Sequence, residues 1–177
     1  MVAVSGNREG ECRIDLPGCA MRGWSSPGIL DRARTSTTWS MVEKTEVYVD
    51  TSAFIAFVDR SDTYHALFRR LFSEPPGIFT TTLVVAEGHA WFLRRYDRFR
   101  ALQFLALIED LKPLKVAQVG PAEQAGATRL LRRFSGQDLT LADAVDLNMM
   151  FERRVKTCWS TDFHLGLTGA KLVVNER

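Results

Sequence analysis

Hydrophobic and polar positions change their spacing several times after residue 41, and the changes predict strands alternating with helices. Short runs rich in β-branched and aromatic residues, such as "VYV" and "IFTT", are typical of buried strands. Longer stretches, such as "DRFRALQFLALIEDL", repeat apolar residues at helical spacing. The predicted strands are 47–49, 78–81, 114–119, 156–161 and 171–174, and the predicted helices are 61–73, 83–96, 97–111, 121–134 and 140–154. This order predicts an α/β fold with a mainly parallel central sheet sandwiched by helices.

The first forty residues have a different character from the rest of the chain. They show no sustained strand or helix period, and they are rich in Gly, Ser, Thr and Pro. Such a composition is typical of loops or disorder. We therefore expect two parts, namely a disordered or misassigned extension over 1–40 and a folded domain over 41–177.

Composition limits the class of protein only loosely. The chain has 177 residues, 25% of them charged, and a net charge of +2, so overall charge does not argue for nucleic-acid binding. Arginines are grouped locally, however, and the pair Arg94–Arg95 shares its predicted helix with an acid, Glu87. The three cysteines form no CxxC motif, which favours a reducing cytoplasm over a disulfide framework or a zinc site. No stretch predicts a membrane span or a signal peptide.

Four acids occupy informative places in the predicted layout. Asp50 directly follows the first strand and interrupts the otherwise apolar "VYVDTSAFIAF", while Asp162 directly follows the fourth strand. Glu87 and Asp143 lie in the first turns of helices. Because the carboxyl ends of parallel strands share one edge of a sheet, and the following helices begin near it, these acids are expected to converge there.

Each acid also has a local explanation that requires no common site. Asp50 could cap the segment that follows it, and Asp162 could simply begin a turn. Glu87 could be an exposed helix residue. Asp143 has the spacing of a capping box with Thr140. Each of these explanations accounts for one acid only.

A shared pocket of carboxylates calls for a cation. Two like charges about 4 Å apart repel by roughly 4 kcal/mol at an effective dielectric constant of about 20. Either the pKa values of the acids rise or a divalent ion binds. Oxygen ligands alone favour Mg²⁺ or Mn²⁺.

Several ordered blocks of the sequence resemble the PIN-domain family. "VYVDTSAFIAFVDRSDTYHALF" is similar to its first block, "TTTLVVAEGHA" to its second, and "LTLADAVDLNMMFERRVKTCWSTDFHL" to its third and fourth. The likeness covers roughly Val47 to Val174, and the closest type is the VapC-like ribonuclease toxin of bacterial toxin–antitoxin pairs. Leu165 departs from the family's common D-x-H-F ending, where Phe is usual.

The resemblance implies a Mg²⁺- or Mn²⁺-dependent endoribonuclease acting on single-stranded RNA. It assigns Asp50, Glu87, Asp143 and Asp162 to catalysis and metal binding, with Ser52 and Ser160 as polar supports. It also implies an antitoxin protein partner and a homodimer. Arg94 and Arg95 are a candidate RNA contact, because their predicted helix also carries Glu87. The alternative is a catalytically silent PIN-like module that binds protein or RNA.

Overall fold

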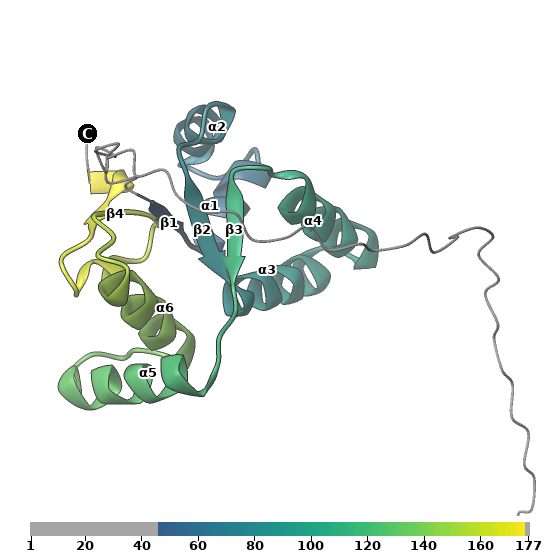
Figure 1. Ribbon diagram of the computed structural model, residues 1–177. Coiled ribbons are helices and arrows are strands. Elements are labelled where there is room, and N and C mark those ends of the chain that lie inside the picture. The colour runs from purple at the N-terminus through teal and green to yellow at the C-terminus, as the bar shows by residue number, and fades with distance from the viewer. Residues whose placement is uncertain (1–45, 176–177) are drawn as a thin grey trace, which may run out of the picture. The chain divides into compact units, whose positions relative to one another are not determined.

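The computed structural model describes residues 46–175, so the prediction for residues 1–40 lies outside the described part of the chain. Five strands form one sheet in the order β3-β2-β1-β4-β5 (Figure 1). They are β1 (Val47–Val49), β2 (Ile78–Thr81), β3 (Leu114–Ala117), β4 (Thr157–Trp159) and β5 (Lys171–Leu172). All four pairings between these strands are parallel, which confirms the predicted parallel α/β architecture.

Helices connect the strands and cover the sheet. They are α1 (Thr51–Val58), α2 (His65–Ser73), α3 (Thr82–Arg95), α4 (Arg98–Asp110), α5 (Pro121–Arg133) and α6 (Leu141–Glu152), with short 3₁₀ helices η1 (Phe163–Gly166) and η2 (Val173–Asn175). Figure 1 shows α3 and α4 to one side of the sheet and the α5–α6 pair to the other. Among the described residues, no helix combines the length and apolar character needed to cross a membrane.

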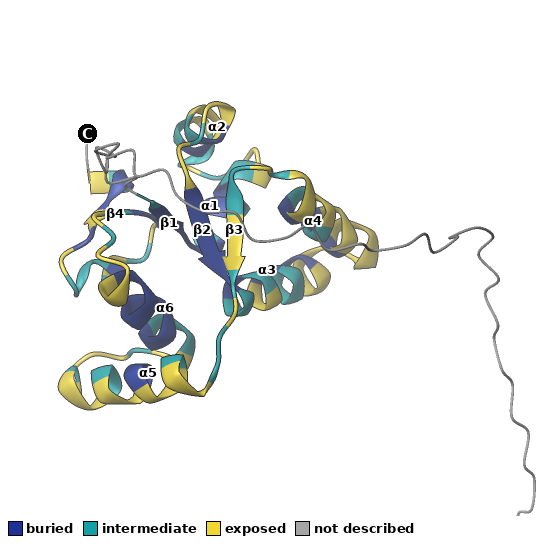
Figure 2. Ribbon diagram, viewed as in Figure 1, coloured by how far each residue is buried: buried dark blue, intermediate teal, exposed yellow. Residues whose placement is uncertain are grey.

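Helix α1 was not predicted. Its sequence "TSAFIAFV" has no polar face, so no helical period shows in it. The helix buries Ala53, Phe54 and Ala56 completely. It follows strand β1, which Figure 2 shows as buried together with β2. Asp50 is its N-cap and accepts a hydrogen bond from the Ser52 backbone N–H, so one of the local explanations for this acid is realised.

The ends of most other elements also differ from the sequence prediction by one or more residues, and α2 and β5 are two clear cases. Helix α2 begins at His65 rather than at Ser61, because the Asp62 carboxylate accepts a 2.7 Å hydrogen bond from the Tyr64 N–H in a turn that precedes the helix. Strand β5 has only two residues, and the chain then enters η2. Short side-chain-to-backbone turns of this kind compete with regular structure and move its ends.

The main core lies on the sheet and is rich in aromatic side chains. Tyr48 and Phe79 from neighbouring strands are fully buried and meet edge to face at 5.3 Å. Phe104 of α4 stacks on Phe92 of α3 with ring centroids 5.1 Å apart. A smaller cluster around Ala127 and Val145 joins α5 to α6. These two clusters fix the helices that begin at the carboxyl edge of the sheet.

Candidate functional site

The carboxyl ends of β1 and β4 lie side by side, and each strand is followed within a few residues by an acid. Val49 pairs with Trp159 in parallel register, and the Asp50 N–H donates a 3.1 Å hydrogen bond to the Trp159 carbonyl oxygen. Asp50 follows β1, and Asp162 follows β4 after two residues. The expectation that these two acids leave the sheet at the same edge is therefore confirmed.

Two serine side chains hold the Asp50 carboxylate in place. Ser52 Oγ donates to Asp50 Oδ2 at 2.6 Å, and Ser160 Oγ donates to the same atom at 2.8 Å. The two hydroxyl oxygens are 3.2 Å apart. Each hydroxyl has one proton and donates it to Asp50 Oδ2. The two hydroxyl oxygens are therefore close together because they share this acceptor, and not because one donates to the other. Both serines that the resemblance proposed as polar supports thus contact the Asp50 carboxylate.

Burial works against the charge of Asp50. The residue is only 9% exposed, and burial raises the pKa of its carboxyl above the usual value, although the hydrogen bonds from Ser52 and Ser160 act in the opposite direction. A raised pKa means that the negative charge is incompletely compensated by the protein. In this environment a bound cation would gain the most electrostatic interaction energy from the carboxylate.

The pair Asp59 and Ser61 repeats the local Asp-x-Ser geometry at an exposed place. Ser61 donates to Asp59 Oδ1 from its N–H at 2.9 Å and from its hydroxyl at 2.6 Å. Here the hydrogen bonds from Ser61 lower the pKa of the Asp59 carboxyl. The same turn therefore produces opposite pKa shifts, and the difference comes from burial of Asp50 in the tertiary structure.

Ser160 also connects Asp50 to Asp162. The Asp162 N–H donates to Ser160 Oγ at 2.9 Å, so the hydroxyl accepts from one acid's backbone while it donates to the other acid's carboxylate. Asp162 is the N-cap of η1 and accepts from the His164 N–H at 2.9 Å. His164 Nδ1 lies 2.9 Å from the same carboxylate oxygen, and the Asp162 side chain is 34% exposed.

Glu87 is joined to this edge through Thr51. The Thr51 hydroxyl, next to Asp50, donates a 2.8 Å hydrogen bond to Glu87 Oε2. Helix α3 begins directly after β2 with Thr81 as its N-cap, so Glu87 lies in the second turn from that edge. The structure therefore brings three of the predicted acids to the same edge through hydrogen bonds with Thr51 and Ser160.

Asp143 is the predicted acid with the weakest connection to the others. It forms the capping box of α6, in which its Oδ2 accepts from the Thr140 N–H at 2.9 Å and from the Thr140 hydroxyl at 2.8 Å. Within residues 46–175, no hydrogen bond joins it to Asp50, Glu87 or Asp162. Its charge nevertheless acts on a residue near Asp50. The negative charges of Asp143 and Asp50 both help to raise the pKa of the Asp146 carboxyl.

Asp146 is an acid that the sequence reasoning missed. It lies one helical turn after Asp143 in α6 and is 3% exposed, and Thr81 Oγ1 donates to its Oδ1 at 2.9 Å. Burial raises the pKa of Asp146 to about 8. The nearby Tyr48 hydroxyl is fully buried and has no hydrogen-bond partner of good geometry in the described structure. The signal in the sequence was an acid on the apolar side of an otherwise buried helix.

The chemistry of these donors fits a hard divalent cation shared with substrate and water. Among residues 46–175, none of the four predicted acids forms an ion pair with Lys or Arg. Nor does this described part contain three or more His, Cys, Asp or Glu side chains close enough to hold a metal ion by themselves. Mg²⁺ usually keeps several waters and is bound through one or two carboxylates plus substrate phosphates. Asp50, with its uncompensated buried charge, is the residue around which such a site would form.

Arg94 and Arg95 lie at the other end of α3 from its first turn. They follow Glu87 by seven and eight residues, which corresponds to about 10–12 Å along a helix axis. The Arg95 guanidinium lies over the Tyr96 ring at 5.6 Å. Contact between these arginines and RNA stays a prediction, and it would involve a stretch of substrate some distance from the acids.

The profile of the PIN domain matches residues 47–164, two-thirds of the chain, so the chain belongs to the PIN-domain family. Among solved structures, the fold is similar to that of VapC20 from Mycobacterium tuberculosis, which is described as a sarcin–ricin loop cleaving toxin. The TM-score is 0.66 at 23% sequence identity, over 72% of this chain and 98% of that one. No curated protein matches the sequence.

Proposed function

We propose that the protein is a divalent-metal-dependent endoribonuclease and the toxin of a toxin–antitoxin pair. The observation that carries this proposal is the arrangement around Asp50 in a PIN-domain chain. Its buried carboxylate is held by two serines, has a raised pKa and has no cationic side chain beside it in the described residues. A buried charge of this kind costs several kcal/mol unless something compensates it.

In this scheme Asp50, Glu87, Asp143 and Asp162 would hold Mg²⁺ or Mn²⁺ at the carboxyl edge of the sheet. The ion supplies Lewis acidity, because it polarises a phosphate and lowers the pKa of a water molecule. Ser52 and Ser160 position the Asp50 carboxylate by directing both hydroxyl protons at one oxygen. Thr51 restrains Glu87. No side-chain nucleophile is required.

RNA is the substrate class that we propose, because the family resemblance implies a ribonuclease and the structurally similar VapC20 is described as a sarcin–ricin loop cleaving toxin. An apolar groove of about 210 Å³ between α1, α3 and α4, lined by residues that include Phe57 and Phe92, is a candidate seat for an antitoxin peptide. Helix-in-groove binding uses such surfaces. A homodimer and a cytoplasmic location remain part of the proposal.

The nuclease proposal is tested by RNA cleavage with and without EDTA. Purified protein should cut ribosomal RNA in Mn²⁺ or Mg²⁺, EDTA should abolish cutting, and Asp50→Asn and Asp143→Asn should each reduce the rate by at least about 100-fold, since both remove a ligand charge. Asp59→Asn is the control for Asp50→Asn, because Asp59 makes the same Asp-x-Ser turn on the surface. An Asp143→Asn variant that cut RNA at the wild-type rate would contradict the scheme.

A matched pair of variants tests whether Ser52 supports the Asp50 carboxylate. Ser52→Ala removes the 2.6 Å hydrogen bond to Asp50, and Ser61→Ala removes the equivalent 2.6 Å bond to Asp59. We expect Ser52→Ala to lower the cleavage rate by about 10- to 100-fold. It should also move the acid limb of the pH–rate profile upward, because the lost donor favoured the charged carboxylate. Ser61→Ala should change neither quantity.

A catalytically silent RNA-binding module is the second candidate. It is favoured by the observation that no three acids of the described structure gather closely enough to hold a metal ion unaided. Such a module would bind RNA without any turnover that depends on Mg²⁺ or Mn²⁺. The EDTA-controlled assay therefore separates the two candidates.

A further inference from the structure

Phe163 is a large apolar side chain exposed beside the site. It directly follows Asp162 and is 67% exposed, the largest fraction among the exposed large apolar residues of the described structure. Its ring lies against the His164 imidazole, with centroids 3.9 Å apart and planes at 33°. His164 is fixed in turn through its contact with the Asp162 carboxylate. The aromatic ring is therefore held in a defined place next to one of the proposed metal-binding acids.

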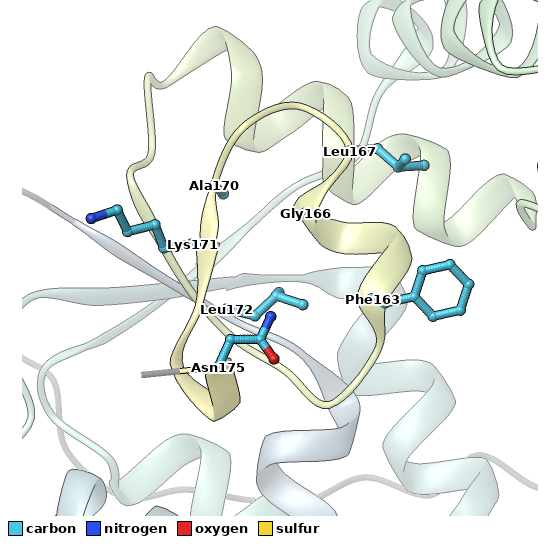
Figure 3. Close-up of a pocket in the computed structure, with 7 residues that line it drawn as sticks. All are labelled: Phe163, Gly166, Leu167, Ala170, Lys171, Leu172 and Asn175. Atoms are coloured by element: carbon cyan, nitrogen blue, oxygen red, sulfur yellow. The ribbon is translucent and has the colours of Figure 1, made fainter. Parts of the chain in front are cut away.

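A hollow of about 500 Å³ lies between η1 and β5, and Phe163 lies at its rim. Figure 3 shows the Leu172 and Asn175 side chains directed toward η1, while the Phe163 ring projects from the far side of η1 and Lys171 points away from the other lining residues. Asn175 follows β5 at the carboxyl end of the sheet, as Asp50 and Asp162 follow β1 and β4. The Phe163 ring therefore projects away from the hollow and is exposed to solvent.

We infer that the exposed Phe163 ring forms a subsite for an unpaired nucleobase of the RNA substrate, next to the bond that is cut. This inference rests on the proposed ribonuclease function. An exposed ring can stack on any base, because every base has a π-face.

The surroundings favour a nucleobase over a protein side chain as the occupant. The ring is adjacent in sequence to Asp162, so an occupant of this subsite lies beside the acids that would meet the phosphate. Phosphates are repelled by carboxylates unless a cation intervenes, so contacts to uncharged bases are the favourable way to hold RNA at this edge. A protein ligand would instead need a contiguous apolar patch, whereas the neighbours of Phe163 in the sequence are the polar residues Asp162 and His164.

The inference is tested on the RNA that the wild-type protein cuts in the EDTA-controlled assay. Phe163→Ala should raise KM by about 5- to 100-fold, which corresponds to the loss of one base–aromatic stack, while kcat changes less. Phe163→Trp should return KM to within about two-fold of the wild-type value, because a stacking surface is restored. Phe151→Ala is the matched control, since Phe151 is 60% exposed and lies at the far end of α6 from Asp143.

A second measurement identifies the partner of the ring. RNA substrates that each lack one base near the scissile bond are compared in wild-type and Phe163→Ala protein. At one position, removal of the base should raise the wild-type KM by a similar factor and should leave the KM of Phe163→Ala unchanged. Such non-additivity is expected only where the ring and that base interact.

The two proposals fail in different ways. If the wild-type protein cuts no RNA in Mn²⁺ or Mg²⁺, the proposed function is wrong, and the proposed base subsite is wrong as well. If the wild-type protein cuts RNA and Phe163→Ala has an unchanged KM, the nuclease stands and the subsite is wrong. Equal, additive losses at every abasic position in both proteins would also overturn it.

Discussion

At the scale of single residues, the local sequence motif and the burial of a side chain have separate effects. Asp50 and Asp59 each accept hydrogen bonds from a serine two residues later. The pKa of Asp59 is lowered and that of Asp50 is raised, because only Asp50 is buried at the end of a core strand. The chemistry of an Asp-x-Ser motif thus depends on where the fold places it.

Asp146 provides the prediction at this scale. Its pKa is raised to about 8, so between roughly pH 4 and pH 8 the folded protein holds a proton that the unfolded chain has lost. The free energy of unfolding then decreases as pH rises through this window, by up to about 1.4 kcal/mol per pH unit. Asp146→Asn is uncharged at every pH and still accepts from Thr81, so it should gain stability relative to wild type from pH 5 to pH 8.

Chemical denaturation of the two proteins at several pH values measures this difference, since other groups contribute equally to both. Asp59→Asn is the control. The pKa of Asp59 is lowered, so its contribution is complete above the unfolded pKa and is lost only in acid. Its difference from wild type should be flat from pH 5 to pH 8. Parallel stability curves for wild type and Asp146→Asn would show that the folded protein does not retain this proton.

At the scale of elements, several acids have a structural role in beginning helices as well as a proposed chemical one. Asp50 caps α1, Asp162 caps η1, and Asp143 completes the capping box of α6. Negative charge is favourable at the positive end of a helix. The local explanations and the site hypothesis are therefore compatible, since helices that begin at one edge of the sheet bring their capping acids to that edge.

The packing of α3 on α4 provides a prediction about stability. A Cβ added at Gly88 would lie 2.5 Å from the Phe104 ring, which is itself packed between Phe92 and Phe54. Gly88→Ala should therefore destabilise the protein by about 1–3 kcal/mol through overpacking, despite a gain of about 1 kcal/mol in helix propensity.

Thermal or urea unfolding measures this effect. Gly136→Ala is the control, since nothing lies within 4 Å of its added Cβ. The double variant Gly88→Ala/Phe104→Leu should recover part of the loss, because the smaller side chain leaves room for the methyl group. A Gly88→Ala protein at least as stable as wild type would show that the two helices adjust without cost.

At the scale of the whole molecule, the parallel sheet brings distant parts of the chain to one edge. Strands β1 and β4 are adjacent although more than one hundred residues separate them, and Ser160 contacts Asp50 across that separation. A ligand that binds only this assembled edge stabilises the folded state by mass action. The stability of the molecule should thus report on metal binding even where catalysis is not measured.

Thermal unfolding in Mn²⁺ and in EDTA provides this test. At a Mn²⁺ concentration about 100 times the dissociation constant, the folded state should gain about 2.7 kcal/mol. The unfolding midpoint of wild type and of Asp59→Asn should rise, and that of Asp50→Asn should not. An equal rise in all three proteins would place the Mn²⁺ site elsewhere.

The sequence by itself determined the order of strands and helices, the parallel sheet and the identity of the acids Asp50, Glu87, Asp143 and Asp162 as candidates. These follow from local periodicity and from the rule that parallel strands end at a common edge. It did not show α1, because a helix that is apolar at nearly every position has no hydrophobic period to detect.

Only the tertiary structure decided the environment of each acid. It showed that Asp50 is buried and held by two serines, that Asp146 lies beside the site with a raised pKa, and that Phe163 is exposed next to Asp162. Burial and hydrogen bonding between distant residues depend on how the elements pack. The order of hydrophobic and polar residues along the chain does not specify the distances between these residues in the folded protein.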